Sequence, residues 1–258
     1  MLFDTHMHCD YSCDSHMVLQ DAIAASQEKN IGITITEHWD YDYPTNPKAF
    51  LFDRDAYFAQ ILPLRSQRVL VGIEMGLQPH IIQENQALAA AHPYDYVLAS
   101  IHCVGRRDLY EPSCYTGRSK EEVVREYLQE TIFCLEEQQD FDAFAHLDYP
   151  CRYWPYEDKE LRLELAPDLF DKFFQTSIRL QKPLEINTRR LDKPESVAAL
   201  LKLYQRYAQL GGRYCTLGSD AHYREHVGRR LDEALKIAQA AGLQPVYFRA
   251  RKMQLMEV

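Results

Sequence analysis

Short hydrophobic runs alternate along the chain with longer stretches in which apolar residues recur every three or four positions. The short runs are typical of buried strands, and the longer stretches are typical of amphipathic helices. We predict strands at residues 1–5, 31–36, 68–73, 94–100, 141–145, 183–186 and 213–217. We predict helices at residues 18–29, 54–66, 83–91, 119–138, 161–181, 195–210 and 229–241. Seven such strand–helix units predict a parallel sheet, either closed into a barrel or open and doubly wound.

The predicted helix ends agree with this pattern. Ser119 and Glu122 have the spacing of a capping box, and Pro194 suits the first turn of the sixth helix. Gly211 and Gly212 follow that helix and would end it. Because no long linker or low-complexity tract interrupts the units, we expect residues 1–258 to form a single domain, with residues 249–258 as a terminal extension.

The composition is that of a soluble globular protein, with 46% hydrophobic and 26% charged residues. The net charge of −9 argues against binding of long nucleic acid. The seven cysteines are odd in number and include no CxxC pair, which favours a reducing compartment over a secreted disulfide scaffold. No targeting segment or membrane-length apolar run stands out. We therefore expect a cytoplasmic protein with no membrane partner.

Histidines and acids stand at the ends of the predicted strands. Parallel strands in a barrel of repeated strand–helix units bring their carboxyl ends to one face. Residues far apart in sequence would then form one cup of imidazoles and carboxylates, a ligand set that suits divalent metals. The set comprises His6, His8, Glu37, His38, Glu74, His102, His146, Glu185, Asp220 and His222.

Two pairs in this set have a spacing that lets both side chains reach one ion. Residues two apart on a strand point to the same face, as His6 and His8 would, and Asp220 and His222 repeat the spacing at the seventh strand end. One such pair is a weak indication, because surface histidines are common. Two pairs together with single ligands at four other strand ends favour a metal site.

These motifs, in this order, resemble those of the PHP (polymerase and histidinol phosphatase) superfamily across nearly the whole chain. They are Asp4-Thr5-His6-Met7-His8, Thr36-Glu37-His38, Gly72-Ile73-Glu74, Ser100-Ile101-His102, Ala145-His146, Glu185-Ile186-Asn187 and Gly218-Ser219-Asp220-Ala221-His222. Shorter segments resemble the histidinol-phosphatase branch of that superfamily. They are Gly76-Leu77-Gln78-Pro79-His80, Gly117-Arg118-Ser119-Lys120-Glu121-Glu122, His146-Leu147-Asp148-Tyr149 and Arg152-Tyr153.

The resemblance implies a distorted (β/α)7 barrel with two or three divalent ions, for which zinc, manganese and iron all suit the ligands. The first ion would be held by His6, His8, Glu74 and Asp220. The second would be held by Glu74, His102 and His146, with the Glu74 carboxylate bridging. The third would be held by Asp14, His38 and His222. Many members have histidine where this chain has Asp14, and His16 lies two residues further on. The residues to which we assign catalytic roles are Glu74, His38 and Asp220.

Four residues are candidates for substrate binding. Arg189 or Arg190, after the sixth strand, could present a guanidinium fork to a phosphate, although a solvated arginine at a helix start is an equal alternative. The superfamily usually has small residues there. His80 could touch substrate from the loop after the third strand, and Glu185 could do so or could orient a metal ligand. Aromatic residues after the second strand could wall the pocket and stack on a flat ring, and simple packing at the barrel rim is an equal alternative. They are Trp39, Tyr41 and Tyr43.

The ligand set and the resemblance together predict hydrolysis of a phosphate monoester by a metal-bridged hydroxide. The most specific interpretation is conversion of L-histidinol phosphate to L-histidinol and phosphate in histidine biosynthesis. The alternatives are a phosphoesterase for nucleotides or oligonucleotide ends, a phosphotyrosine phosphatase, and an inactive metal-binding module. The sequence leaves the metal and the oligomeric state open.

Overall fold

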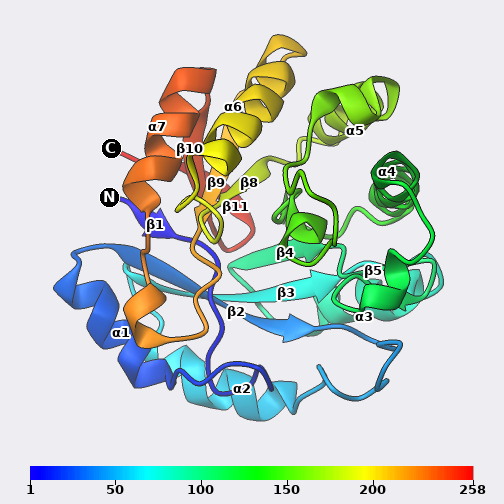
Figure 1. The fold of residues 1–258 in the computed structure, drawn as a ribbon. Helices are drawn as coiled ribbons and strands as arrows, with labels where there is room; N and C mark the ends of the chain where they lie inside the picture. Colours follow the sequence, from blue (N-terminus) through cyan, green and yellow to red (C-terminus); the bar gives the residue numbers. More distant parts are fainter. Residues whose placement is uncertain (258) are drawn as a thin grey trace.

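Seven parallel strands form the centre of the molecule in the computed structural model, which describes residues 1–257 (Figure 1). In spatial order they are β1 (Phe3–Asp4), β2 (Gly32–Trp39), β3 (Val69–Gly76), β4 (Tyr96–Ser100), β7 (Ala143–Phe144), β8 (Leu184–Asn187) and β9 (Tyr214–Gly218). The chain after β1 meets β9 and closes the sheet, because the Thr5 amide donates to the Leu217 carbonyl at 2.8 Å and Met7 bridges Ala221 in parallel. The alternation of strands and helices is confirmed, and the sheet is a closed barrel.

Helices surround the strands on the outside (Figure 1). They are α1 (Leu19–Glu28), α2 (Arg54–Ile61), α3 (Ile82–Ala91), α4 (Lys120–Glu137), α5 (Pro167–Arg179), α6 (Pro194–Gln209) and α7 (Leu231–Ala241). The expected capping box of α4 is present, with Ser119 and Glu122 each accepting a hydrogen bond from the other's backbone amide. No helix within residues 1–257 is both long enough and apolar enough to cross a membrane.

Some element boundaries differ from the expectation. The stretches 54–66 and 161–181 each contain a short 3-10 turn, η1 (Leu62–Leu64) and η4 (Leu163–Leu165), because Pro63 and Pro167 lack the amide that a continuous helix needs. Strands β2 and β3 run three residues beyond the predicted ends at 36 and 73. Two proposed ligands, His38 and Glu74, therefore lie within strands, where backbone pairing fixes their direction.

Alternation along the strands separates two clusters of buried apolar residues. Val97 and Ala99 of β4 belong to the larger cluster, which includes the buried faces of the helices. Tyr96 and Leu98 belong to a smaller cluster. Leu98 pairs in register with Glu74, so the second face is the barrel interior, and Glu74 lies on it.

The terminal hairpin, β10 (Gln244–Arg249) and β11 (Lys252–Leu255), closes the end of the barrel at which the strands begin. The Arg251 Nε atom lies 2.5 Å from the carboxylate of Asp142, just before β7, and the Ala250 amide donates to Asp95, just before β4, at 2.8 Å. The expectation of a mere extension is wrong for residues 249–255. The strand β11 is mostly exposed and has little apolar periodicity, so the hydrophobic pattern did not indicate a strand there. Val258 lies outside the described residues.

We expect Arg251→Ala to destabilise the fold without affecting the opposite end of the barrel. The substitution removes the partner of the nearly buried Asp142 carboxylate, which costs roughly 1–3 kcal/mol. Thermal unfolding should show a melting temperature lower by several degrees, whereas Arg125→Ala, which removes the exposed pair with Asp168, should change it little. Equal melting temperatures for the two variants would contradict this role of the hairpin.

Candidate metal and phosphate site

The carboxylate of Glu74 is completely buried at the open end of the barrel, and imidazole nitrogens surround it. Five of these nitrogens lie 2.8 to 3.5 Å from the nearer carboxylate oxygen. They belong to His6, His8, His38, His102 and His146. Burial alone would raise the pKa of Glu74, but the neighbouring imidazoles, led by His6, lower that pKa well below its usual range. The carboxylate is therefore ionised.

A second group of ligand atoms lies at the mouth of this cluster. Asp220 Oδ1 is 3.5 Å from His8 Nε2, and Asp14 Oδ2 is 3.5 Å from His38 Nε2 and 3.3 Å from His222 Nε2. The Asp14 side chain is 44% exposed on the irregular segment before α1, whereas the histidines are nearly buried. All nine predicted metal ligands thus lie in one cup.

Carboxylates behind the cup hold two of the imidazoles in one orientation. Glu185 Oε1 lies 2.8 Å from His6 Nδ1, and Asp40 Oδ1 lies 2.8 Å from His102 Nδ1. With Nδ1 protonated toward a carboxylate, the Nε2 lone pair of each ring is directed at the cluster. This is the arrangement that metal-binding histidines use.

His8 is held in the same way through a hydroxyl group. Its Nδ1 atom lies 3.2 Å from Ser12 Oγ, which donates to Glu37 at 2.5 Å. The Cys9 amide also donates to Glu37, at 3.0 Å. Glu37 is buried, and burial raises its pKa to about 7. This acid supports the cluster from behind rather than facing the cup.

Two glycines make room for the supporting carboxylates. A Cβ atom on Gly218 would lie 2.1 Å from Glu185 Oε1 and 2.5 Å from His6 Cβ. A Cβ atom on Gly76 would lie 1.9 Å from Asp40 Oδ1. Each glycine therefore permits the contact that orients one imidazole.

The arrangement fits divalent ions. Four groups of three ligand atoms lie within 4.8 Å of one another, and every residue in them is buried. The Nε2 atoms of His6 and His8 face each other at 3.0 Å, an approach that two lone pairs tolerate only with a proton or a cation between them. Glu74 Oε2 has no hydrogen bond of good geometry despite its three imidazole neighbours. Converging nitrogen and carboxylate donors of this kind suit zinc, manganese or iron.

The cup opens into a cavity of about 220 Å³ with two guanidinium groups in its wall. Arg152 Nη2 lies 2.7 Å from Asp220 Oδ2, and this side chain is only 9% exposed. Arg189 Nη1 donates to the Asp220 carbonyl at 3.3 Å, and its side chain is 43% exposed. The cavity is lined by Asp14, His38, His102, His146, Tyr149, Arg152, Tyr153, Arg189, Asp220, His222 and Tyr223.

Arg190, the second arginine considered for phosphate binding, lies outside this cavity. Its guanidinium group is buried, 3.0 Å from Asp148 Oδ2 and 2.8 Å from Glu160 Oε1. Because the two carboxylates accept from the Arg190 guanidinium group, Arg190 connects the segment after β7 to the turn after β8. We therefore do not assign Arg190 to phosphate binding.

Two further candidates for substrate contact also lie outside the cavity. Glu185 is buried behind His6, so it has the orienting role, which was the alternative to substrate contact. His80 lies on the outer rim, where its Nε2 atom is 2.9 Å from Asp42 Oδ2. Neither side chain faces the cup.

Arg152 and the tyrosines of the wall were not singled out by residue chemistry in the sequence. The turn η3 (Tyr149–Arg152) has three residues per turn and so brings Tyr149 and Arg152 to one side, with the guanidinium carbon 5.0 Å from the ring centre. The lining aromatics are thus Tyr149, Tyr153 and Tyr223, rather than the expected residues after β2. The Arg152-Tyr153 segment of the resemblance was the available signal.

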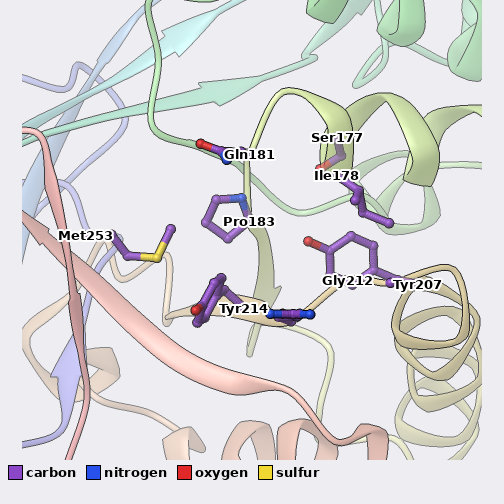
Figure 2. Close-up of a pocket in the computed structure, with 10 residues that line it drawn as sticks. Ser177, Ile178, Gln181, Pro183, Tyr207, Gly212, Tyr214 and Met253 are labelled. Carbon is purple, nitrogen blue, oxygen red and sulfur yellow. The ribbon is translucent and has the colours of Figure 1, made fainter.

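A larger cavity of about 480 Å³ lies at the other end of the barrel, where β8 and β9 begin. Figure 2 shows residues that line it, which come from α5, α6, β9, β11 and the segments that lead into β8 and β9. Arg213 is the one charged residue among those that line it, and they include no histidine or acid. This lining offers no metal-binding group.

The chain is similar to several known proteins. The family model described as PHP domain matches residues 4–189. A protein named "probable histidinol-phosphatase" from Clostridium acetobutylicum is 41% identical over 98% of this chain and 99% of its own length. A histidinol-phosphatase from Lactococcus lactis is 30% identical over 93% of this chain and 91% of its own length. The crystal structure of a Lactococcus lactis histidinol phosphate phosphatase, complexed with zinc, L-histidinol and phosphate, matches with a TM-score of 0.92 and 28% identity over 98% of each chain.

We expect Gly218→Ala to reduce the metal content of the purified protein. The added methyl group would displace Glu185 and His6, so the His6 imidazole would lose its orientation. Elemental analysis should show at least one ion fewer per chain than in the wild type. Gly242→Ala is the control, because Gly242 has a φ of +74° and open space around it, so this variant should lose stability but keep its metal. Unchanged metal content in Gly218→Ala would show that Glu185 does not support the cluster.

Proposed function

Because the chain belongs to the PHP domain family, we propose that it is a metal-dependent phosphatase that hydrolyses L-histidinol phosphate to L-histidinol and phosphate. The observation that carries this proposal is the cup itself, in which Arg152 and Arg189 border a buried cluster of imidazoles around Glu74. The named relatives and the zinc-, histidinol- and phosphate-bound structure support the same substrate.

We propose that the cup holds two or three divalent ions, with zinc as the first candidate. The first ion would be held by His6, His8, Glu74 and Asp220. The second would be held by Glu74, His102 and His146. The third would be held by Asp14, His38 and His222. When bound, divalent ions activate water as a nucleophile and neutralise charge on a phosphoryl group.

The two arginines would bind the phosphate group of the substrate. Burial would by itself lower the pKa of Arg152, but the nearby carboxylates, led by Asp220, raise that pKa above its ordinary value. Its guanidinium group is therefore permanently charged and held in place before substrate arrives, which is the arrangement that favours stabilisation of developing charge. Arg189 is more exposed and can close onto the phosphate from the solvent side.

Three residues would contribute to catalysis through the ions and the phosphate. Glu74 would keep two groups of imidazoles together because each of its oxygens faces a different group. Asp220 faces His8 and also holds Arg152, so it would fix the phosphate relative to the metal ligands. His38 lies between Glu74 and Asp14 and would connect the inner and outer ligands.

The organic part of the substrate would lie against the aromatic wall of the cavity. Tyr149 and Tyr153 pack edge to face, with ring centres 5.4 Å apart, and Tyr223 forms another part of the lining. A flat imidazole ring stacks well on such surfaces. The cavity of about 220 Å³ suits a small ester better than a long polymer.

The substrate proposal is tested by comparing kcat/KM for histidinol phosphate, p-nitrophenyl phosphate, AMP and a short oligonucleotide. We expect histidinol phosphate to exceed the others by at least about tenfold, because contacts with its organic part supply transition-state binding that simpler esters lack. If AMP or the oligonucleotide gave the highest kcat/KM by tenfold, the substrate assignment would be wrong while the metal-dependent phosphatase would stand.

The role of the arginines is tested by Arg152→Ala and Arg189→Ala. Each substitution should lower kcat/KM by about one to two orders of magnitude, as loss of a charge-assisted hydrogen bond of about 1.5–3 kcal/mol implies. The control is Arg206→Ala, which removes an ion pair between α6 and α5, away from the cup, and should leave kcat/KM unchanged. Wild-type kinetics in Arg152→Ala would mean that this guanidinium group does not touch phosphate.

A further inference from the structure

Asn187, the last residue of β8, uses both ends of its side-chain amide. It is 3% exposed, and its Nδ2 atom donates to Glu185 Oε2 at 3.0 Å. Its Oδ1 atom accepts two hydrogen bonds, one from Arg152 Nη2 at 3.2 Å and one from the Arg189 amide at 3.0 Å. One buried side chain thus contacts both arginines of the cup wall.

The partner of Asn187 on its other side is tied to the imidazole cluster. Glu185 Oε1 lies 2.8 Å from His6 Nδ1, and Glu185 Oε2 accepts from the His146 amide at 2.9 Å. A continuous path of hydrogen bonds therefore runs from the two histidines through Glu185 and Asn187 to the arginines. Among the residues of this path, only His146, Arg152 and Arg189 line the cavity.

We propose that Asn187 is a positioning residue that sets Arg152 and Arg189 at a fixed place relative to the metal ligands. This inference rests on the proposed phosphatase function. Phosphoryl transfer depends mainly on positioning and on neutralisation of charge, so a small displacement of a guanidinium group lowers the rate without any change in the reacting groups.

Arg152 depends on this contact because few others hold it. Its Nη2 atom forms an ion pair with Asp220 Oδ2 and donates its one hydrogen bond to Asn187 Oδ1, and its Nε atom has no hydrogen bond. Without Asn187, only the Asp220 contact would remain, together with packing against the Tyr149 ring. The guanidinium plane could then rotate about that single contact.

Arg189 depends on Asn187 through its backbone. The hydrogen bond from the Arg189 amide to the Asn187 side chain spans two residues and forms an Asx turn at the end of the strand. This turn directs the Arg189 side chain toward the Asp220 carbonyl, which it contacts at 3.3 Å. Substituting Asn187 would release the start of this turn.

The test uses the metal-loaded enzyme and inorganic phosphate as the probe. For Asn187→Ala, we expect the inhibition constant of phosphate and the KM for substrate to rise by about tenfold, with metal content unchanged within error. Asn187→Ser serves as a second variant, because serine can keep the turn to Arg189 but is too short to bridge Arg152 and Glu185. Asn187→Ser should lose phosphate affinity by a similar factor, and it supplies the test if Asn187→Ala folds poorly.

A double-mutant cycle separates positioning from a general structural role. If Asn187 acts through the two arginines, Asn187→Ala should weaken phosphate binding by less than about threefold in a background that carries both Arg152→Ala and Arg189→Ala. A general loss of structure would weaken binding by the same factor in both backgrounds, and that result would overturn the proposal. Thr188→Val is the neighbouring control, because the Thr188 hydroxyl is buried without a hydrogen-bond partner, so its phosphate affinity should match the wild type.

The outcomes distinguish this inference from the function on which it rests. A wild-type enzyme that hydrolyses phosphate esters, together with Asn187→Ala and Asn187→Ser variants of unchanged phosphate affinity, would overturn the role of Asn187 alone. A fully metal-loaded wild-type protein that neither hydrolyses phosphate esters nor binds phosphate would overturn both.

Discussion

Glu74 places an ionised carboxylate where water does not reach, and most features of the open end of the barrel follow from that. An isolated charge in such a position costs several kcal/mol or more, so it requires compensation from its neighbours. The compensation comes from imidazoles, and each imidazole must present a particular nitrogen. Glu185 and Asp40 fix the rings of His6 and His102 for this purpose. The glycines beside these acids are a further consequence, because a methyl group there would occupy the same space.

The contacts that stabilise the fold and the residues that form the site lie at opposite ends of the barrel. At the end where the strands begin, the terminal hairpin covers apolar side chains and pairs Arg251 with Asp142. At the end where the strands finish, polar groups face one another with little apolar packing between them. A barrel with this division can keep a polar cluster in place because its stability comes from its other end. The hydrogen bonds from Glu185 through Asn187 extend the rigid part of the site to the arginines at its edge.

The fold and the cup were largely predictable from the sequence, because both follow from short-range patterns. Strand–helix alternation predicts parallel strands, and parallel strands bring ligands such as His6 and Glu74 together whatever their distance in sequence. The direction of a side chain in a turn is not encoded in this way. Arg189 and Arg190 are adjacent and chemically identical, yet one faces the cavity and the other is buried between Asp148 and Glu160. Arg152 was missed for the same reason, because its position depends on a 3-10 turn with no apolar periodicity.

We propose that one carboxylate, Glu74, organises metal ions beside a phosphate site formed by Arg152 and Arg189. The most direct test is a crystal structure of the protein with phosphate, with anomalous scattering recorded on both sides of the zinc, manganese and iron absorption edges. The account predicts ions on both oxygens of Glu74 and a phosphate in contact with Arg152. Full occupancy of phosphate away from both arginines, or anomalous peaks with no contact to Glu74, would contradict it.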